Sequence, residues 1–94
     1  MKPDCLFCRI IARELPSKIV YEDAAVLAFD DIAPQAPTHV LIIPKTHFAT
    51  VNDVADADAG VFSTLVLRAR EIAGGLGIAA AGYRLLFNCN WAGG

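Results

Sequence analysis

The sequence predicts an α+β protein with a mostly antiparallel sheet, a short helix at the N-terminus and one long helix. Two observations carry this prediction. Short β-branched and apolar segments follow one another with turn residues between them, which is typical of antiparallel strands. Residues 56–73 instead repeat their apolar side chains with the 3.6-residue period of a helix.

The N-terminal helix is expected over residues 5–13. Asp4 follows Pro3 and is a residue type that commonly caps a helix N-terminus. Pro16 marks the latest point at which the helix ends. The apolar residues between these limits share one helical face: Leu6, Phe7, Ile10 and Ile11.

Three strands are expected in the middle of the chain. Residues 18–22 and 26–30 alternate apolar and polar side chains around Asp23, which predicts a hairpin. Residues 39–43 are β-branched and apolar on both faces until Pro44, and this pattern predicts a central strand.

The long helix is expected over residues 56–73, with Gly74 and Gly75 ending it. Its apolar face comprises Phe62, Leu65, Val66, Ala69, Ile72 and Ala73. A last strand is expected over residues 83–88.

The composition limits the class of protein. Ninety-four residues form a single domain, and 55% of them are hydrophobic. The longest apolar run, residues 24–29, is far below the roughly 20 residues that a membrane span needs, so no membrane partner is expected. The apolar surplus instead favours burial against a second subunit, and therefore a homodimer.

Charge and cysteine content point to small ligands and a reducing compartment. A net charge of −2 without a basic cluster disfavours binding to a nucleic acid polymer. Three cysteines make an odd number for a disulfide framework, and the N-terminus lacks the apolar core of a signal peptide. We therefore expect a cytoplasmic protein.

The Cys5-x-x-Cys8 pair has three interpretations. A redox pair is favoured by the lower thiol pKa at a helix N-terminus, but such a site is usually fed by a strand, which the four preceding residues do not supply. Two small buried core residues are the second interpretation. The third is a metal site, in which both sulfurs lie on one helical face and His47, in a loop, is a better third ligand than His39 at a strand start.

The most specific motif in the sequence is Asp31-Ile-x-Pro-x-Ala-Pro-x-His39 followed by Ile43-Pro-Lys-x-His47. With this motif, the sequence from Cys5 to about Asn88 resembles the histidine triad (HIT) family, in particular its Hint-like branch of purine nucleoside phosphoramidases. The resemblance implies a structural zinc site at Cys5, Cys8 and His47, with a triad histidine as fourth ligand. It also implies a two-fold dimer joined through the long helix and residues 83–88.

The resemblance further implies a purine nucleotide site. Asp31 matches the residue that binds the ribose hydroxyls, although a solvated turn aspartate is the alternative. Ile10, Phe29 and Ile32 match positions that line the purine slot, whereas Phe29 is equally suited to the core. Asn88 matches a position near the α-phosphate, with turn capping as the alternative. His39 is expected to be structural.

The chain ends at Gly94, before the family's His-x-His-x-His strand. We therefore expect a single HIT-like domain over residues 1–94, C-terminally truncated, with an incomplete zinc site and no catalytic residue. Two functions follow. The first is the family's hydrolysis of phosphoramidates through a nucleotidyl-histidine, which requires the missing triad. The second is a non-catalytic module that binds nucleotide or zinc, or dimerises.

Overall fold

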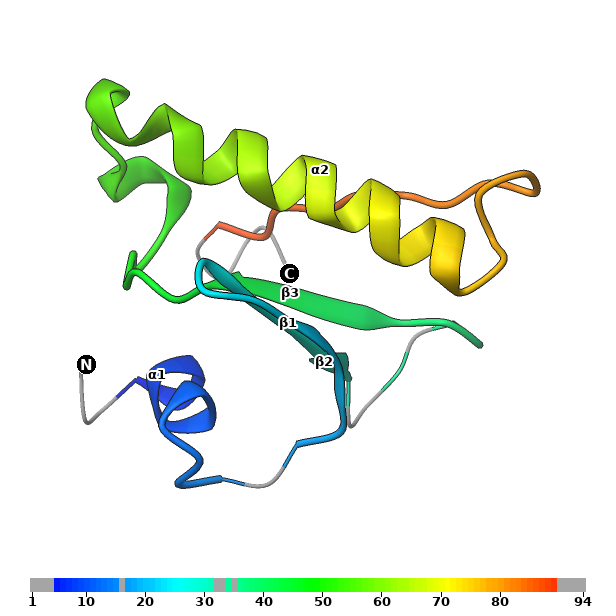
Figure 1. The fold of residues 1–94 in the computed structure, drawn as a ribbon. Helices are drawn as coiled ribbons and strands as arrows, with labels where there is room; N and C mark the ends of the chain where they lie inside the picture. Colours follow the sequence, from blue (N-terminus) through cyan, green and yellow to red (C-terminus); the bar gives the residue numbers. More distant parts are fainter. Residues whose placement is uncertain (1–4, 16, 32–33, 35, 90–94) are drawn as a thin grey trace. The chain divides into compact units, whose positions relative to one another are not determined.

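The computed structural model of the protein describes residues 5–15, 17–31, 34 and 36–89. The chain divides into two compact units, Met1–His47 and Phe48–Gly94. The first unit contains a short helix and a three-stranded sheet, and the second contains one long helix (Figure 1). The predicted α+β class is confirmed. That the two units form one domain stays a prediction.

Helix α1 spans Leu6–Ile11 and is shorter than the predicted 5–13. Cys5 is its N-cap, with extended backbone and no side-chain capping bond, and the predicted cap Asp4 lies outside the described residues. The helix ends early because Arg13 adopts a left-handed backbone conformation, with φ of 64°.

The sheet contains β1 (Ile19–Glu22), β2 (Val26–Asp30) and β3 (Val40–Pro44), all antiparallel and in the order β1-β2-β3. The predicted hairpin is confirmed. Its turn is fixed by the Asp23 carboxylate, which accepts hydrogen bonds from the backbone N–H groups of Ala25 (2.7 Å) and Val26 (2.9 Å).

The prediction that β3 is the central strand is wrong for the described residues. The centre is β2, in which Val26–Phe29 are all buried, whereas β3 pairs with β2 alone. Four of the five β3 residues are only partly buried. An apolar pattern on both faces of a strand reports the burial of those faces and does not specify how many strands lie beside it.

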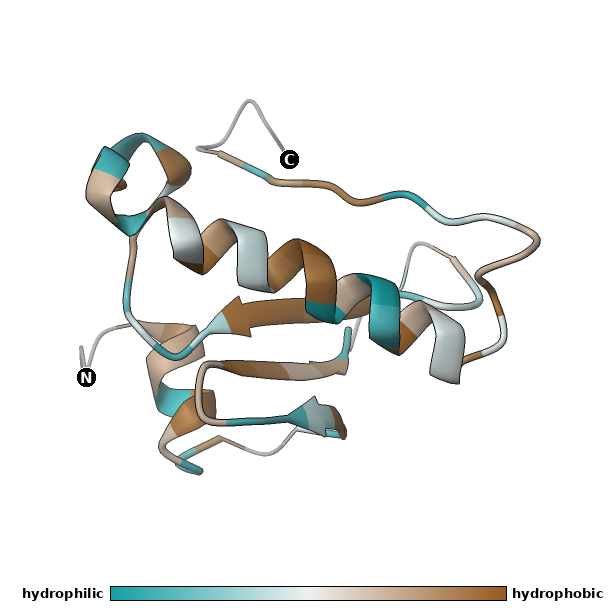
Figure 2. Cartoon of the chain, turned by 45° about the horizontal axis from the view of Figure 1, so that its top comes forward, coloured by the Kyte–Doolittle hydropathy of each residue, from teal (hydrophilic) through white to brown (hydrophobic). Residues whose placement is uncertain are grey.

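The core of the first unit lies between α1 and one face of the sheet. Leu27 and Phe29 alternate along β2, and Ile43 and Leu41 stand directly opposite them on β3. All four therefore share a sheet face, and Ile10 of α1 packs against it. Figure 2 shows that β2 and β3 are mainly apolar, whereas hydrophilic and hydrophobic residues alternate along the long helix.

The long helix α2 spans Ala59–Gly75 and follows two 3₁₀ turns, Val51–Asp53 and Asp56–Asp58. The predicted start at residue 56 is thus a 3₁₀ turn. The first 3₁₀ turn is closed by a capping box, in which Thr50 Oγ1 accepts from Asn52 N and the Asp53 carboxylate accepts from Thr50 N.

The predicted stop at Gly74 and Gly75 is also wrong, because both residues belong to α2. The helix ends through Gly77, which has a φ of 77°. Its N–H donates to Gly74 O, and the N–H of Ile78 donates to Ala73 O at 3.1 Å. This is a Schellman arrangement, which needs glycine at the left-handed position one residue beyond the C-cap.

Residues 83–88 do not form the predicted strand. The segment is extended and runs back alongside α2 (Figures 1 and 2). Phe87 contacts Phe62 of α2, with ring centroids 5.8 Å apart. An extended apolar segment becomes a strand only when a neighbouring strand completes its hydrogen bonds, and none does so within the described residues.

No helix among the described residues is both long enough and apolar enough to cross a membrane.

Candidate metal centre and nucleotide site

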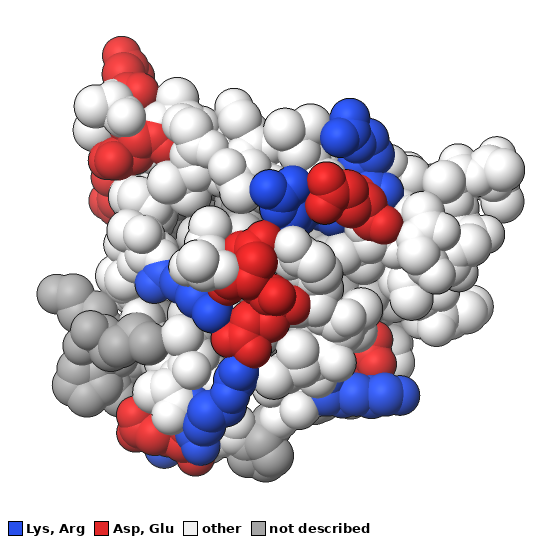
Figure 3. Space-filling view, viewed as in Figure 1, with Lys and Arg blue, Asp and Glu red and all other residues white. Residues whose placement is uncertain are grey.

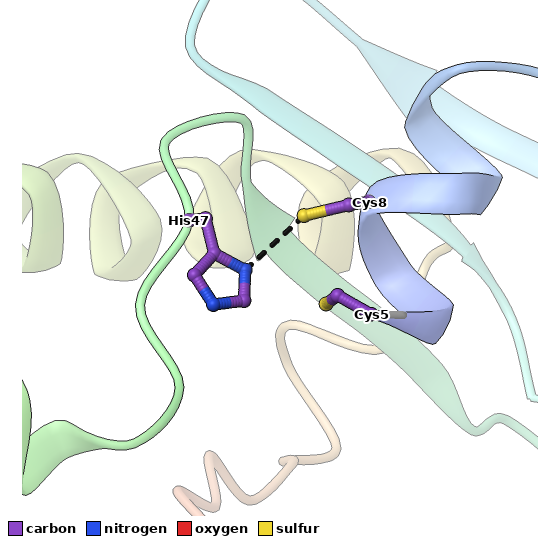
Figure 4. Close-up of side chains that lie close together, drawn as sticks. All are labelled: Cys5, Cys8 and His47. Carbon is purple, nitrogen blue, oxygen red and sulfur yellow. Dashed lines mark hydrogen bonds between the residues drawn. The ribbon is translucent and has the colours of Figure 1, made fainter. Parts of the chain in front are cut away.

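Cys5, Cys8 and His47 converge on one point. One ligand atom of each residue lies within 4.8 Å of the others, and Cys8 Sγ lies 3.1 Å from His47 Nδ1 (Figure 4). The convergence predicted from the spacing of these residues is therefore present, and all three cysteines of the chain are free thiols.

Local structure brings the three side chains together. Cys5 and Cys8 are one turn apart at the start of α1, so their sulfurs project from the same side of the helix. Ile10 anchors α1 in the core, and Cys8 is itself buried. His47 follows Lys45, whose backbone N–H donates to Ala25 O at 2.8 Å and so holds the loop after β3 against the hairpin turn.

The donor set suits zinc. Two thiolates and an imidazole are ligands that zinc prefers, with metal–ligand distances of about 2.0 to 2.3 Å. Tetrahedral geometry at those lengths separates neighbouring ligand atoms by about 3.3 to 3.8 Å. The spacing of Cys5, Cys8 and His47 brackets that range, so small side-chain rotations suffice for a metal ion to bind. Within the described part of the chain this group has three members.

Asp31 and His39 form a second pair, at the end of the β2–β3 ladder where the chain leaves β2 and later enters β3. The N–H of Asp31 donates to His39 O at 2.9 Å, which continues the ladder one residue beyond Asp30 and Val40. His39 Nε2 lies 3.4 Å from Asp31 Oδ2, and the two side chains are 29% and 21% exposed. His39 thus orients a half-buried carboxylate.

The pairing register places the first nucleotide candidates on one face. Asp31 stands two residues after Phe29, so both side chains are on the sheet face that α1 covers. Ile10 contributes from α1. Ile10 and Phe29 are 7% and 4% exposed, so the core role left open for Phe29 is present, and contact with a purine stays a prediction.

Comparison with known proteins identifies the family. A sequence model of the family described as scavenger mRNA decapping enzyme C-term binding matches residues 4–89. The purine nucleoside phosphoramidase of Escherichia coli strain K12 is 49% identical over 94 residues, which are all of this chain and 79% of that protein. The chain belongs to the histidine triad family.

Solved HIT structures show the same fold. A HIT family hydrolase from Legionella pneumophila Philadelphia 1 superimposes with a TM-score of 0.93 at 52% identity, covering 97% of this chain and 81% of that one. A HIT family hydrolase from Clostridium thermocellum gives a TM-score of 0.95 at 49% identity, covering all of this chain and 82% of that one. The HIT fold predicted from the sequence is thus confirmed.

Two further residues were predicted from the HIT resemblance to bind the nucleotide, Ile32 and Asn88. Ile32 lies outside the described residues. Asn88 is an exposed residue of the second unit, in the extended segment after α2. Its predicted role near a phosphate therefore stays a prediction.

The sequence did not reveal a charged cluster around Glu22. Glu22 binds Lys45 and Arg13, and hydrogen bonds from Lys45 first and Arg13 second hold its pKa below the usual value. On the face shown in Figure 3, acidic and basic side chains lie beside one another. Which charged side chains form ion pairs depends on which strands are neighbours, so no periodic pattern in the sequence predicts these pairs.

Proposed function

We propose that this HIT protein binds purine nucleotides and belongs functionally with the phosphoramidases that hydrolyse purine nucleoside phosphoramidates. In the reaction proposed for the family, a histidine attacks the α-phosphorus of a nucleoside phosphoramidate and the amine leaves. Water then hydrolyses the nucleotidyl-histidine. The 49% identity to the E. coli purine nucleoside phosphoramidase supports this assignment.

The observation that carries the nucleotide-binding proposal is the Asp31–His39 pair beside the face formed by Ile10 and Phe29. Asp31 presents a half-buried carboxylate at a strand end, already oriented by His39 at 3.4 Å. A carboxylate in this position can accept hydrogen bonds from both hydroxyls of a ribose. The neighbouring apolar side chains, which belong to the core, are proposed to form the wall against which a flat base packs.

The remaining roles follow the family pattern. Ile32 is proposed to line the purine slot together with Ile10 and Phe29. Asn88 is proposed to donate a hydrogen bond to an oxygen of the α-phosphate, because an amide N–H binds that oxygen without adding charge.

Cys5, Cys8 and His47 are proposed to hold a structural zinc ion. When bound, the ion would supply a cross-link between α1 and the loop after β3, because its ligands come from these two segments. The three residues would hold it, with a fourth ligand completing the tetrahedron.

The 94 residues contain two histidines, and both are engaged. His39 pairs with Asp31 and His47 with Cys8. We therefore propose that the 94-residue chain alone binds nucleotide without turning over phosphoramidates. This favours a second function, a nucleotide-binding or dimerisation module, which is also supported by the exposed apolar segment at residues 83–87.

Calorimetric titration of the mass-verified chain with AMP, GMP and CMP tests the binding proposal. We expect AMP and GMP to bind and CMP to bind much more weakly. Asp31→Asn should weaken AMP binding at least about tenfold, because an amide replaces one of the acceptors that the ribose hydroxyls use. Asp58→Asn is the matched control, since Asp58 is exposed and makes no capping bond.

A fluorogenic adenosine phosphoramidate tests turnover by the same protein. We expect rates close to background, because loss of a catalytic nucleophile costs on the order of 10⁶ in turnover in a well-studied hydrolase. Turnover comparable to an intact HIT enzyme, abolished by His39→Ala or His47→Ala, would assign the nucleophile to that histidine instead.

A further inference from the structure

Glu22 connects the two segments that supply the metal ligands. Cys5 and Cys8 belong to the start of α1, and His47 belongs to the loop after β3. Glu22 is the last residue of β1. One carboxylate oxygen, Oε1, accepts a hydrogen bond from Arg13, two residues beyond α1, and the other, Oε2, lies 2.7 Å from Lys45 Nζ, two residues before His47.

The strand register explains why Glu22 reaches both partners. Glu22 stands opposite Leu27 of β2, and Leu27 stands opposite Ile43 of β3. Lys45 follows Ile43 by two residues, so the Glu22 and Lys45 side chains are on the same sheet face. This is the face on which α1 packs through Ile10, and the Glu22–Lys45 pair therefore meets Arg13 there.

Both arms of this bridge are constrained. Arg13 has a left-handed backbone, which is uncommon for a residue with a side chain and persists where surrounding contacts fix it. Lys45 is held through its backbone N–H by Ala25 O at 2.8 Å. The side chains of Glu22 and Lys45 are 30% and 27% exposed and that of Arg13 is 50% exposed, so the Lys45 arm is less open to water than the Arg13 arm.

We propose that Glu22 is a positioning residue for the Cys5, Cys8 and His47 metal centre. Its carboxylate joins the end of α1 to the loop after β3 and so fixes the separation at which the three ligand atoms meet. Glu22 touches none of the ligands and acts through Arg13 and Lys45. The inference rests on the metal-binding part of the proposed function.

Cobalt(II) titration of the metal-free, reduced chain tests the inference directly, because thiolate-bound cobalt absorbs visibly and zinc competition then gives the zinc affinity. We expect Glu22→Gln to weaken both affinities about tenfold, at the low end of the effect of residues that orient metal ligands. Glu71→Gln is the matched control, since it removes the same charge from an ion pair with Arg68 in the second unit. It should leave both affinities unchanged.

Thermal unfolding with and without zinc separates positioning from general stability. Zinc raises the melting temperature by an amount set by its affinity for the folded chain. A purely structural Glu22 would lower the melting temperature of both forms equally and preserve that rise. We expect Glu22→Gln to reduce the rise itself, and Lys45→Gln, which keeps the Arg13 arm, to reduce it by less.

Each outcome decides the inference. Glu22→Gln binding cobalt within twofold of the parent, or weakening no more than Glu71→Gln, overturns it. Should Glu22→Gln fail to fold, an unchanged cobalt affinity of Lys45→Gln overturns it. A parent chain that binds no cobalt overturns both the metal centre and this inference, whereas the nucleotide titrations test the remaining function independently.

Discussion

At the residue scale, the candidate functional side chains of this HIT chain lie where cross-strand neighbours or local turns bring residues together. Asp31 and His39 are opposite one another at the end of a ladder, and Cys8 and His47 are brought together from α1 and the loop after β3. In each pair one residue fixes the orientation of the other. Replacing one residue of a pair should therefore change the affinity for nucleotide or zinc more than it changes the free energy of unfolding.

The proposed zinc site gives a prediction for its cysteine ligands. Cys5→Ser should lower zinc affinity at least about tenfold, because a hydroxyl is a far poorer zinc ligand than a thiolate. Competition with a chromophoric chelator measures the change. Cys89→Ser, which alters a cysteine in the second unit, serves as the control. An equal loss of zinc affinity in both variants would show that Cys5 is not a zinc ligand.

Glu22 gives a prediction for how the stability of the chain depends on pH. Its folded-state pKa is lowered, chiefly by the Lys45 hydrogen bond and then by Arg13, so the ionised form is favoured in the folded chain. The resulting stability is present above the unfolded pKa of about 4.3 and is lost as pH falls through the folded value.

Urea unfolding of the metal-free chain across pH 3 to 7 measures this dependence. The parent should lose free energy of unfolding more steeply than Glu22→Gln below about pH 4.3, because only the parent carries the shifted carboxyl. If the free energy of unfolding falls equally with pH in the two proteins, the Glu22 carboxylate does not contribute to the pH dependence of stability.

At the element scale, the agreement between sequence and structure depends on whether a signal is local. The hairpin was predicted closely because alternation and the Asp23 turn lie within a few residues of one another. The convergence of the Cys5 and Cys8 side chains was predicted because the two residues share a helical turn. The position of β3 in the sheet and the Asp31–His39 contact were missed, since both depend on the identity and register of neighbouring strands.

The end of α2 is another feature that the sequence alone did not predict correctly. Two consecutive glycines predicted a stop at residues 74–75, yet the helix continues until Gly77 supplies a left-handed residue. Helix interiors tolerate glycine at a cost of up to about 1 kcal/mol each, whereas a Schellman end requires one particular position. Composition alone does not tell these two uses of glycine apart.

This difference predicts opposite effects for two neighbouring substitutions. Gly77→Ala should destabilise the chain by about 1 to 2 kcal/mol, because alanine disfavours the left-handed conformation. Gly75→Ala should be neutral or stabilising, because it lies within α2 and an added Cβ meets no atom within 4 Å. Urea unfolding followed by circular dichroism measures both, and equal effects would contradict the assignment of the helix end.

At the scale of the whole molecule, the second unit leaves apolar surface uncovered. Leu86 and Phe87 are 70% and 52% exposed, and Val66 and Leu67 of α2 are also exposed. The extended segment that carries Leu86 has no strand partner among the described residues. Exposed apolar side chains of this kind can mark a protein interface, so we expect a second copy of the chain to cover them.

The last prediction is therefore a dimer that depends on this segment. Sedimentation velocity at micromolar concentration should give about twice the 10.0 kDa chain mass. Leu86→Lys should shift the protein toward monomer, because burying an unpaired ammonium in an apolar interface is costly. Ile19→Lys is the control: Ile19 is also exposed, at 41%, but lies on the edge strand β1 of the first unit, where lysine is well tolerated. If the parent sediments as a monomer, or if Ile19→Lys dissociates the dimer as strongly as Leu86→Lys does, the apolar segment is not the interface.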